Sequence, residues 1–311
     1  MRILFAGTPE IAVKSLEKLA SRHECTVLTA PDKISGRGKN VQASPVKIKA
    51  EELNLPVIQP ERLGSSAREA VMEYKPELLA TFAYGKIFGP KFLSMFPGGG
   101  LNVHPSLLPK YRGPSPIPAA ILAGETVTGV TVQRLAEGMD TGDIVLQKKI
   151  PLNGTETTPL LEEQSSIIGA DLLSEAADLL EAGKIKETPQ DPAMATFCRI
   201  INKKDGLIDW SLPAVYIERM VRAYLGWPGA YTFLGQKKLV VLSAGIFSGT
   251  GEGIKEGTVA GIDKGSGILV QTGDGIIAVN YLQLQSKKPM DFMSFANGYR
   301  NLTGSILGGN E

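Results

Sequence analysis

The chain opens with the stretch Met1-Arg-Ile-Leu-Phe-Ala-Gly7-Thr-Pro-Glu10, which decides its class of fold. Arg2–Ala6 is a short, mostly apolar run of the kind that forms a buried strand. Thr8, Pro9 and Glu10 then supply a helix N-cap, a proline in the first turn and an early carboxylate. The stretch therefore predicts a strand that is followed at once by a helix over residues 11–21.

The same alternation of strand and helix signals continues through the first part of the chain. Further strands are expected at residues 25–29, 57–58, 77–82, 101–104 and 127–134, and helices at 44–53, 65–74 and 160–180. Helices of this length between strands imply right-handed βαβ crossovers. We therefore predict an α/β domain over residues 1–187, with a Rossmann-like, mostly parallel sheet.

The second part of the chain follows a different pattern. Residues 188–207 begin with Thr188-Pro-Gln-Asp-Pro192, which is typical of a linker. A helix is expected over 213–223, and short strands separated by turn signals are expected at 238–247, 257–262, 268–271 and 276–284. This pattern predicts a small C-terminal β-barrel of the OB type over residues 208–311.

Composition narrows the class further. The chain has 311 residues, of which 43% are hydrophobic, so two globular domains are expected. Its two cysteines suggest neither a metal site nor a disulfide framework, which favours the cytoplasm. No apolar run reaches about 18 residues, so no membrane span is expected. The net charge of +1 decides nothing about nucleic acid, but Lys33–Lys49 contains Lys and Arg side chains and no acidic residue.

Two separate segments carry polar groups suited to catalysis. They are Asn102-Val-His104-Pro-Ser-Leu-Leu-Pro109 and Gly138-Met-Asp140-Thr-Gly-Asp143. Asn102 and His104 are two residues apart, so on a strand their side chains point to the same face. An amide N–H stabilises a developing oxyanion, an imidazole moves a proton, and a carboxylate orients the imidazole. The three residues therefore suggest acyl transfer between nitrogen atoms.

Each of these residues also has an ordinary structural explanation. Asn and Asp are common turn residues, and a single histidine near a strand end is often only a satisfied polar group. Asp140 and Asp143 could be metal ligands, but no histidine or cysteine cluster joins them, so we expect no metal. The first strand is not followed by the glycine fingerprint of a dinucleotide site, so an NAD-dependent oxidoreductase is disfavoured.

The combined pattern of the two segments resembles the 10-formyltetrahydrofolate-dependent formyltransferases. The resemblance extends over nearly the whole chain through four further segments, which point to a member that acts on charged tRNA. These are Phe5-Ala-Gly-Thr-Pro9, the loop Ala30–Lys39, Ser44-Pro-Val-Lys47, and Ile208-Asp-Trp-Ser211 with Trp227-Pro228.

The resemblance assigns roles to particular residues of this sequence. It implies a catalytic trio of Asn102, His104 and Asp140. It implies a folate site that is lined by Phe82, Ala83, Tyr84, Gly85, Ser106, Leu107, Leu108, Pro109, Glu137, Gly138 and Met139. It also implies tRNA contacts from Arg37, Gly38, Lys39 and Lys203. From the residues alone, a basic loop between glycines suits phosphate groups, but a solvated surface loop has the same composition.

The activity that the resemblance implies is transfer of the formyl group of 10-formyltetrahydrofolate, a co-substrate, to the α-amino group of methionyl initiator tRNA. We expect a cytoplasmic monomer without a metal or a membrane partner. Two alternatives remain at this point. One is the same folate chemistry on an amino-sugar nucleotide, and the other is a nucleic-acid-binding protein whose α/β domain has lost its activity.

Overall fold

The computed structural model describes residues 1–35, 40–249, 251, 253–299 and 301–308. The chain divides into two compact units. The first contains Met1–Pro116, Val127–Pro151 and Leu161–Cys198, and the second contains Ile117–Thr126, Leu152–Leu160 and Arg199–Glu311.

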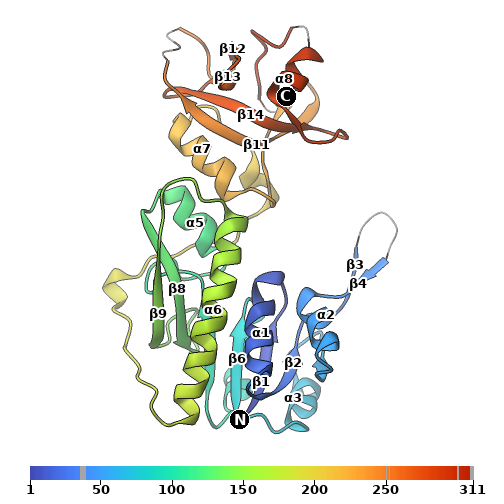
Figure 1. Cartoon of the computed structure of the whole chain (residues 1–311), viewed down its shortest axis with the longest axis vertical. Coiled ribbons are helices and arrows are strands. Elements are labelled where there is room, and N and C mark those ends of the chain that lie inside the picture. Colours follow the sequence, from blue (N-terminus) through green and yellow to red (C-terminus); the bar gives the residue numbers. More distant parts are fainter. Residues whose placement is uncertain (36–39, 250, 252, 300, 309–311) are drawn as a thin grey trace. The chain divides into compact units, whose positions relative to one another are not determined.

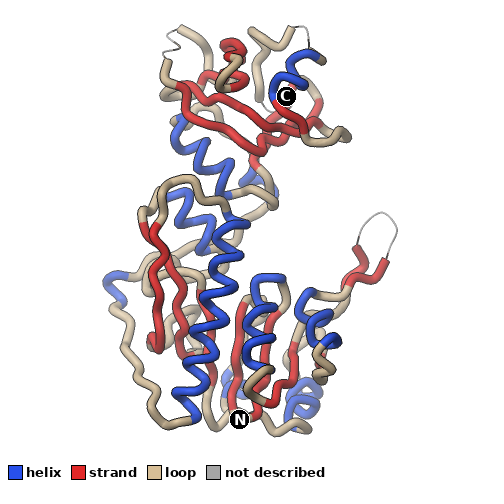
Figure 2. Tube along the Cα trace, in the orientation of Figure 1, coloured by secondary structure: helices blue, strands red, loops and turns tan. Residues whose placement is uncertain are grey.

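A 7-stranded sheet forms the centre of the first unit (Figures 1 and 2), in the order β5-β2-β1-β6-β7-β8-β9. Neighbouring strands from β5 to β7 are parallel, whereas β8 and β9 are antiparallel to their neighbours. The strands are β1 (Arg2–Gly7), β2 (Glu24–Leu28), β5 (Val57–Ile58), β6 (Leu78–Phe82), β7 (Gly100–His104), β8 (Val127–Arg134) and β9 (Ile144–Pro151). The predicted mostly parallel α/β sheet is confirmed.

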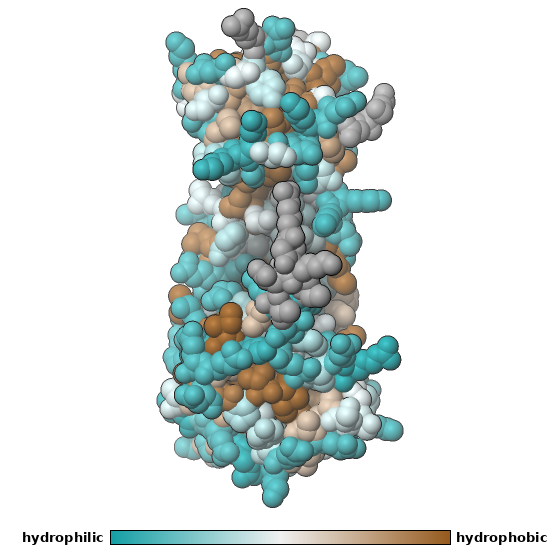
Figure 3. Space-filling view, turned by 90° about the vertical axis from the view of Figure 1, so that its right-hand side faces the viewer, coloured by the Kyte–Doolittle hydropathy of each residue, from teal (hydrophilic) through white to brown (hydrophobic). Residues whose placement is uncertain are grey.

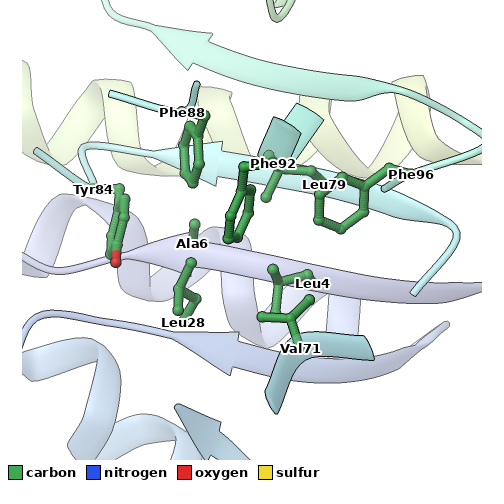
Figure 4. Packing of buried hydrophobic residues seen from close by; sticks show 9 residues of the cluster. All are labelled: Leu4, Ala6, Leu28, Val71, Leu79, Tyr84, Phe88, Phe92 and Phe96. Atoms are coloured by element: carbon green, nitrogen blue, oxygen red, sulfur yellow. The ribbon is translucent and has the colours of Figure 1, made fainter. Parts of the chain in front are cut away.

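Helices cover both faces of this sheet, so its central strands are buried on both sides. On one face, Val71 and Phe92 pack with Leu4, Ala6 and Leu79 of the sheet (Figure 4). On the other face, a Cβ at Gly169 of α6 would lie only 2.8 Å from Val103 of β7. The elements around the sheet are η1 (Glu10–Ala12), α1 (Val13–Ala20), α2 (Pro45–Glu52), α3 (Ser65–Met72), α4 (Pro90–Leu93), α6 (Thr158–Glu181), η2 (Pro192–Met194) and the hairpin of β3 (Lys33–Ser35) with β4 (Asn40–Gln42).

The strand order places a topological switch between β1 and β6. From β1 the chain builds β2 and β5 on one side, and it then returns to build β6 and β7 on the other. In open α/β sheets, ligands bind beyond the carboxyl ends of the strands at such a switch point. Gly7, Phe82 and His104 are the last residues of β1, β6 and β7, so they mark this edge of the sheet.

The second unit is built on a 6-stranded antiparallel sheet, in the order β10-β11-β14-β13-β12 with β15 paired to β14. The C-terminal segment bridges its two outer strands, because Leu307 pairs with Leu234 at the end of β10 and Ile306 pairs with Thr258 next to β12. The predicted C-terminal domain of antiparallel strands is confirmed, whereas the closure of these strands into a barrel of the OB type stays a prediction. The elements are α5 (Pro116–Ala123), η3 (Lys203–Gly206), α7 (Ala214–Ala223), β10 (Ala230–Leu234), β11 (Lys237–Phe247), β12 (Val259–Asp263), β13 (Gly267–Gln271), β14 (Ile276–Leu284), β15 (Met290–Asp291) and α8 (Phe292–Asn297).

On the face drawn in Figure 3 most residues are hydrophilic, and hydrophobic residues lie among them. Ile87 and Met139 are among the exposed large hydrophobic residues of the first unit. Among the described residues, no helix combines the length and the apolar character that a membrane span requires.

Candidate active site

Asn102 and His104 lie on β7 at the edge of the sheet where the parallel strands end. The antiparallel ladder places Gln133 of β8 opposite Asn102, and Thr131 opposite His104. Side chains of directly opposed residues project from the same face of a sheet. The register therefore gathers an amide pair and an imidazole on one face of the sheet.

The imidazole of His104 is nearly enclosed, with 5% of its side chain exposed. Its Nε2 lies 2.9 Å from the carbonyl oxygen of Tyr111. Because a carbonyl only accepts hydrogen bonds, the neutral ring carries its proton on Nε2. The lone pair on Nδ1 then faces Asp140, whose Oδ1 is 3.6 Å away. His104 is therefore placed to accept a proton at Nδ1.

Asp140 comes from the loop between β8 and β9 and completes the group. Its Oδ2 accepts a hydrogen bond from the backbone N–H of Gly113 at 2.8 Å, and its Oδ1 accepts one from Gln133 Nε2 at 2.9 Å. Its backbone has a φ of +53°, a left-handed conformation that aspartate tolerates better than most residues. Non-glycine residues held in this region cluster at functional sites.

The amide of Asn102 closes the trio on the remaining side. Its Nδ2 lies 3.5 Å from Asp140 Oδ1, which is a long contact for a hydrogen bond. An amide nitrogen has two N–H donors, and only one of them is needed for Asp140. The structure thus brings Asn102, His104 and Asp140 together from two segments, with a donor, a proton acceptor and a fixed negative charge in mutual reach.

Burial shifts the pKa of His104 more than Asp140 and Tyr111 do. Burial lowers the pKa of His104 below its ordinary value of 6.5, while the Asp140 carboxylate and the Tyr111 carbonyl oppose this more weakly. At neutral pH the ring is therefore an uncharged base. The pKa of His104 is lower in the folded chain than in the unfolded chain. At a pH between these two pKa values, the folded chain therefore binds fewer protons than the unfolded chain. The free energy of unfolding thus decreases as the pH drops below 6.5.

We predict that His104 titrates with a midpoint below 6.5. The chain has two histidines, so a His23→Gln variant leaves one imidazole. In this variant, the NMR signal of histidine labelled at the ring carbons reports His104 alone. A midpoint at or above 6.5 would contradict the burial argument.

The residues after β7 form a tightly bonded loop. Thr131 Oγ1 donates to the Ser106 carbonyl at 2.6 Å and accepts from the backbone N–H of Leu108 at 3.2 Å. The hydroxyl of Ser106 is buried and donates to the Lys110 carbonyl. Of the predicted folate-site residues in this loop, Leu107 and Pro109 are partly exposed, whereas Ser106 and Leu108 are buried. The loop is therefore rigidly attached to β8.

The predicted folate-site residues at the end of β6 and directly after it occupy buried and exposed positions. Phe82 is buried, and Tyr84 stacks on Phe88 at a centroid distance of 5.4 Å (Figure 4). Ala83 and Gly85 are exposed and have φ values of +51° and +82°. These two exposed residues thus have a left-handed backbone on either side of the buried Tyr84.

The other predicted site residues lie in several places. Glu137, Gly138 and Met139 are exposed in the loop that carries Asp140, and Met139 is 59% exposed. Lys203 is exposed in η3 of the second unit. Arg37, Gly38 and Lys39 lie outside the described residues.

Sequence reasoning missed the residues that support the trio. Gln133 is buried in β8, and Gln190 follows Pro189 in the segment after α6. Gln133 is one of several polar residues of β8, so nothing in the sequence distinguished it, and nothing marked Gln190. In the described part of the chain, the grouping that could hold a metal is His23, Asp178 and Glu181, which does not include the trio.

A Rossmann-like sheet that presents an amide, an imidazole and a carboxylate at a strand end is suited to an acyl-transferring enzyme. The family model described as formyl transferase matches residues 1–176, and the one described as formyl transferase, C-terminal domain matches residues 200–300. The chain belongs to the formyl transferase family, which confirms the resemblance found in the motifs.

Relatives and solved structures extend this finding. The methionyl-tRNA formyltransferase of Treponema denticola is 45% identical, over 96% of this chain and 97% of that protein. The methionyl-tRNA formyltransferase of Geotalea daltonii is 41% identical, over 99% of this chain and 98% of that protein. HypX from Aquifex aeolicus in complex with tetrahydrofolic acid has a TM-score of 0.65 at 18% identity, covering 97% of this chain and 48% of that one. This chain thus spans about half of HypX, and at that identity the likeness concerns the fold.

Proposed function

We propose that this chain transfers the formyl group of 10-formyltetrahydrofolate to the α-amino group of methionyl initiator tRNA. The observation that carries the proposal is the trio at the end of β7, found in a chain whose relatives of this name align along nearly their whole length. The reaction moves a one-carbon acyl group from one nitrogen to another, and this chemistry needs an oxyanion donor and a proton carrier.

The roles that we assign to the trio follow from its geometry. As the α-amine attacks the formyl carbon, a C–N bond forms and the formyl oxygen becomes negative. The second N–H of Asn102 donates to this oxygen, and Nδ1 of His104 accepts the proton that the amine loses. When the bond to the folate nitrogen breaks, the same proton passes to that nitrogen and tetrahydrofolate leaves. Asp140, 3.6 Å from Nδ1, stabilises the protonated imidazole between these steps.

We assign the folate to the three segments around the trio, namely 82–85, 106–109 and 137–139. Ala83 and Gly85 are exposed, so their backbone amide and carbonyl groups are available to the edge of a flat heteroaromatic ring. The exposed side chain of Met139 offers a polarisable apolar surface for the face of such a ring. Pockets for small molecules combine apolar walls with a few placed polar groups in this way.

We assign the tRNA to the basic residues outside this pocket. Arg37, Gly38 and Lys39 belong to the basic stretch Lys33–Lys49, and Lys203 lies on the exposed surface of η3. In this proposal, residues 1–187 perform the chemistry, 188–207 connect the two parts, and 208–311 hold the tRNA. The protein acts as a monomer in the cytoplasm, where charged initiator tRNA is used.

A comparison of acceptors tests the proposal. 10-Formyltetrahydrofolate labelled at the formyl carbon is incubated with the full chain and one acceptor at a time. The acceptors are methionyl initiator tRNA, uncharged initiator tRNA and a dTDP-amino sugar. We expect label on the methionine amine only. Transfer to the amino sugar without transfer to charged tRNA would replace the proposed acceptor with an amino-sugar nucleotide.

A further inference from the structure

Four side chains of the first unit form a line of hydrogen bonds that ends on Asp140. Nε and Nη2 of Arg112 donate to Oε1 of Gln190 at 3.0 and 2.8 Å. Nε2 of Gln190 donates to Oε1 of Gln133 at 3.2 Å, and Nε2 of Gln133 donates to Oδ1 of Asp140 at 2.9 Å. We call this line the Arg112–Asp140 relay.

The chemistry of its first member fixes the direction of the whole relay. A guanidinium group only donates, so the oxygen of the Gln190 amide must face Arg112 and its nitrogen must face Gln133. The oxygen of the Gln133 amide then faces Gln190, which leaves its nitrogen toward the carboxylate. If the Gln133 amide were reversed, its oxygen would oppose a carboxylate oxygen of Asp140. If the Gln190 amide were reversed, its nitrogen would oppose the donors of Arg112 and its oxygen would oppose carbonyl oxygens. The relay therefore presents a donor to Asp140 and not an acceptor.

Gln190 also holds the backbone of the loop that carries Asp140. Its Nε2 lies 2.9 Å from the carbonyl oxygen of Asp140 and 2.6 Å from that of Gly142. Asp140 has a left-handed backbone, and such a conformation persists only where surrounding contacts determine it. The two N–H groups of this amide thus face three acceptors, of which the Gln133 oxygen is the most distant. They hold the peptide to which the carboxylate is attached and also contact Gln133, which bonds the carboxylate itself.

Two members of the relay, Arg112 and Gln133, are buried, and Gln190 and Asp140 are half-buried, so the relay is shielded from most of the solvent. Arg112 is 7% exposed and Gln133 is 2% exposed. In a low-dielectric interior, a hydrogen bond is stronger and an unpaired polar group is more costly than in water. A carboxylate held by such a network has one preferred position. A shift of a catalytic group by about 1 Å can reduce a rate by about 10²-fold.

We propose that Gln133 and Gln190 are positioning residues that set the carboxylate of Asp140 against His104 for formyl transfer. This inference rests on the proposed function, because it takes Asp140 as a member of the catalytic trio. The two glutamines act through Asp140 and need not touch either substrate. Their removal should therefore lower kcat and leave the KM for folate and for charged tRNA nearly unchanged.

Two variants remove the relay in different ways. Gln190→Glu keeps an acceptor for Arg112 but has no N–H for Gln133 or for the loop carbonyls. Gln133→Met keeps the volume of the side chain and removes the donor to Asp140. We expect each variant to lower kcat by roughly 10- to 100-fold, with KM changed less than about 3-fold. Gln164→Glu is the matched control, because this half-buried glutamine of α6 belongs neither to the trio nor to the relay nor to the segments assigned to folate and tRNA, and the variant should keep full kcat.

A mutant cycle separates positioning from general destabilisation. Single-turnover rates are measured for Gln133→Met, Asp140→Ala and the double variant, with thermal unfolding recorded for each. If Gln133 acts through Asp140, it adds less than about 2-fold to the loss already caused by Asp140→Ala. A multiplicative loss in the double variant, or a full kcat in Gln133→Met, would overturn the relay alone. A full rate in Asp140→Ala would overturn the catalytic role of Asp140 and the relay with it.

Discussion

Replacing His104 with alanine is expected to lower kcat for formyl transfer by about 10²- to 10⁴-fold, the usual contribution of general acid–base catalysis. The imidazole is buried, its Nε2 proton is committed to the Tyr111 carbonyl, and its Nδ1 faces Asp140. Without it, the attacking amine has no placed group to take its proton. The KM for folate should change little, because the proposed pocket residues remain. Steady-state rates with charged initiator tRNA measure both quantities.

The chain offers a matched control for this variant. His23 is the other histidine, and it is buried among Asp178 and Glu181 near the end of α6. His23→Gln should keep kcat within about 2-fold while removing the same type of side chain. A His104→Ala enzyme that is folded and turns over at the wild-type rate would contradict the proposed role of the imidazole.

Replacing Asn102 with alanine is expected to lower kcat by about 10²- to 10³-fold, as the loss of one oxyanion donor does in other acyl-transfer sites. The effect should fall on kcat rather than on KM, because the negative charge on the formyl oxygen develops only during reaction. Removal of the amide also takes away its long contact with Asp140, but Gln133 and Gly113 still hold that carboxylate.

Asn153 provides the comparison for this second variant. Its Oδ1 accepts hydrogen bonds from the backbone N–H and the hydroxyl of Thr155 in the exposed segment after β9, which does not include the trio. Asn153→Ala should therefore leave kcat unchanged even if it lowers the unfolding temperature slightly. If Asn102→Ala raised KM and left kcat intact, the amide would be a ground-state binding group and not an oxyanion donor.

Burial explains why the sequence predicted β6 and missed β9. β6 is buried at every position, and its apolar run predicted it correctly. β9 is mostly half-buried or exposed and contains Gln147 and two lysines, so it lacked both an apolar run and a regular alternation. The bridge from the segment around Leu307 to both outer strands of the second sheet depends on contacts between residues far apart in the sequence.

The trio was predicted because its residue types are unusual together, whereas its supports are ordinary residues. Asn102 and His104 share a face through the two-residue period of a strand, which a sequence displays directly. Gln133 meets Asn102 only through the antiparallel register of β7 and β8. Gln190 reaches Asp140 from a proline-rich segment 50 residues away. Positions of this kind follow from tertiary packing, which no local pattern records.

In the proposed mechanism, His104 and Asp140 work as one catalytic unit. The direct measurement is a set of single-turnover formyl-transfer rates for the wild type, His104→Ala, Asp140→Ala and the double variant, all with methionyl initiator tRNA. We predict that the double variant is no slower than the slower single variant, because either change alone disables the unit. A double variant in which the two losses multiply would show two independent contributions and would contradict the account.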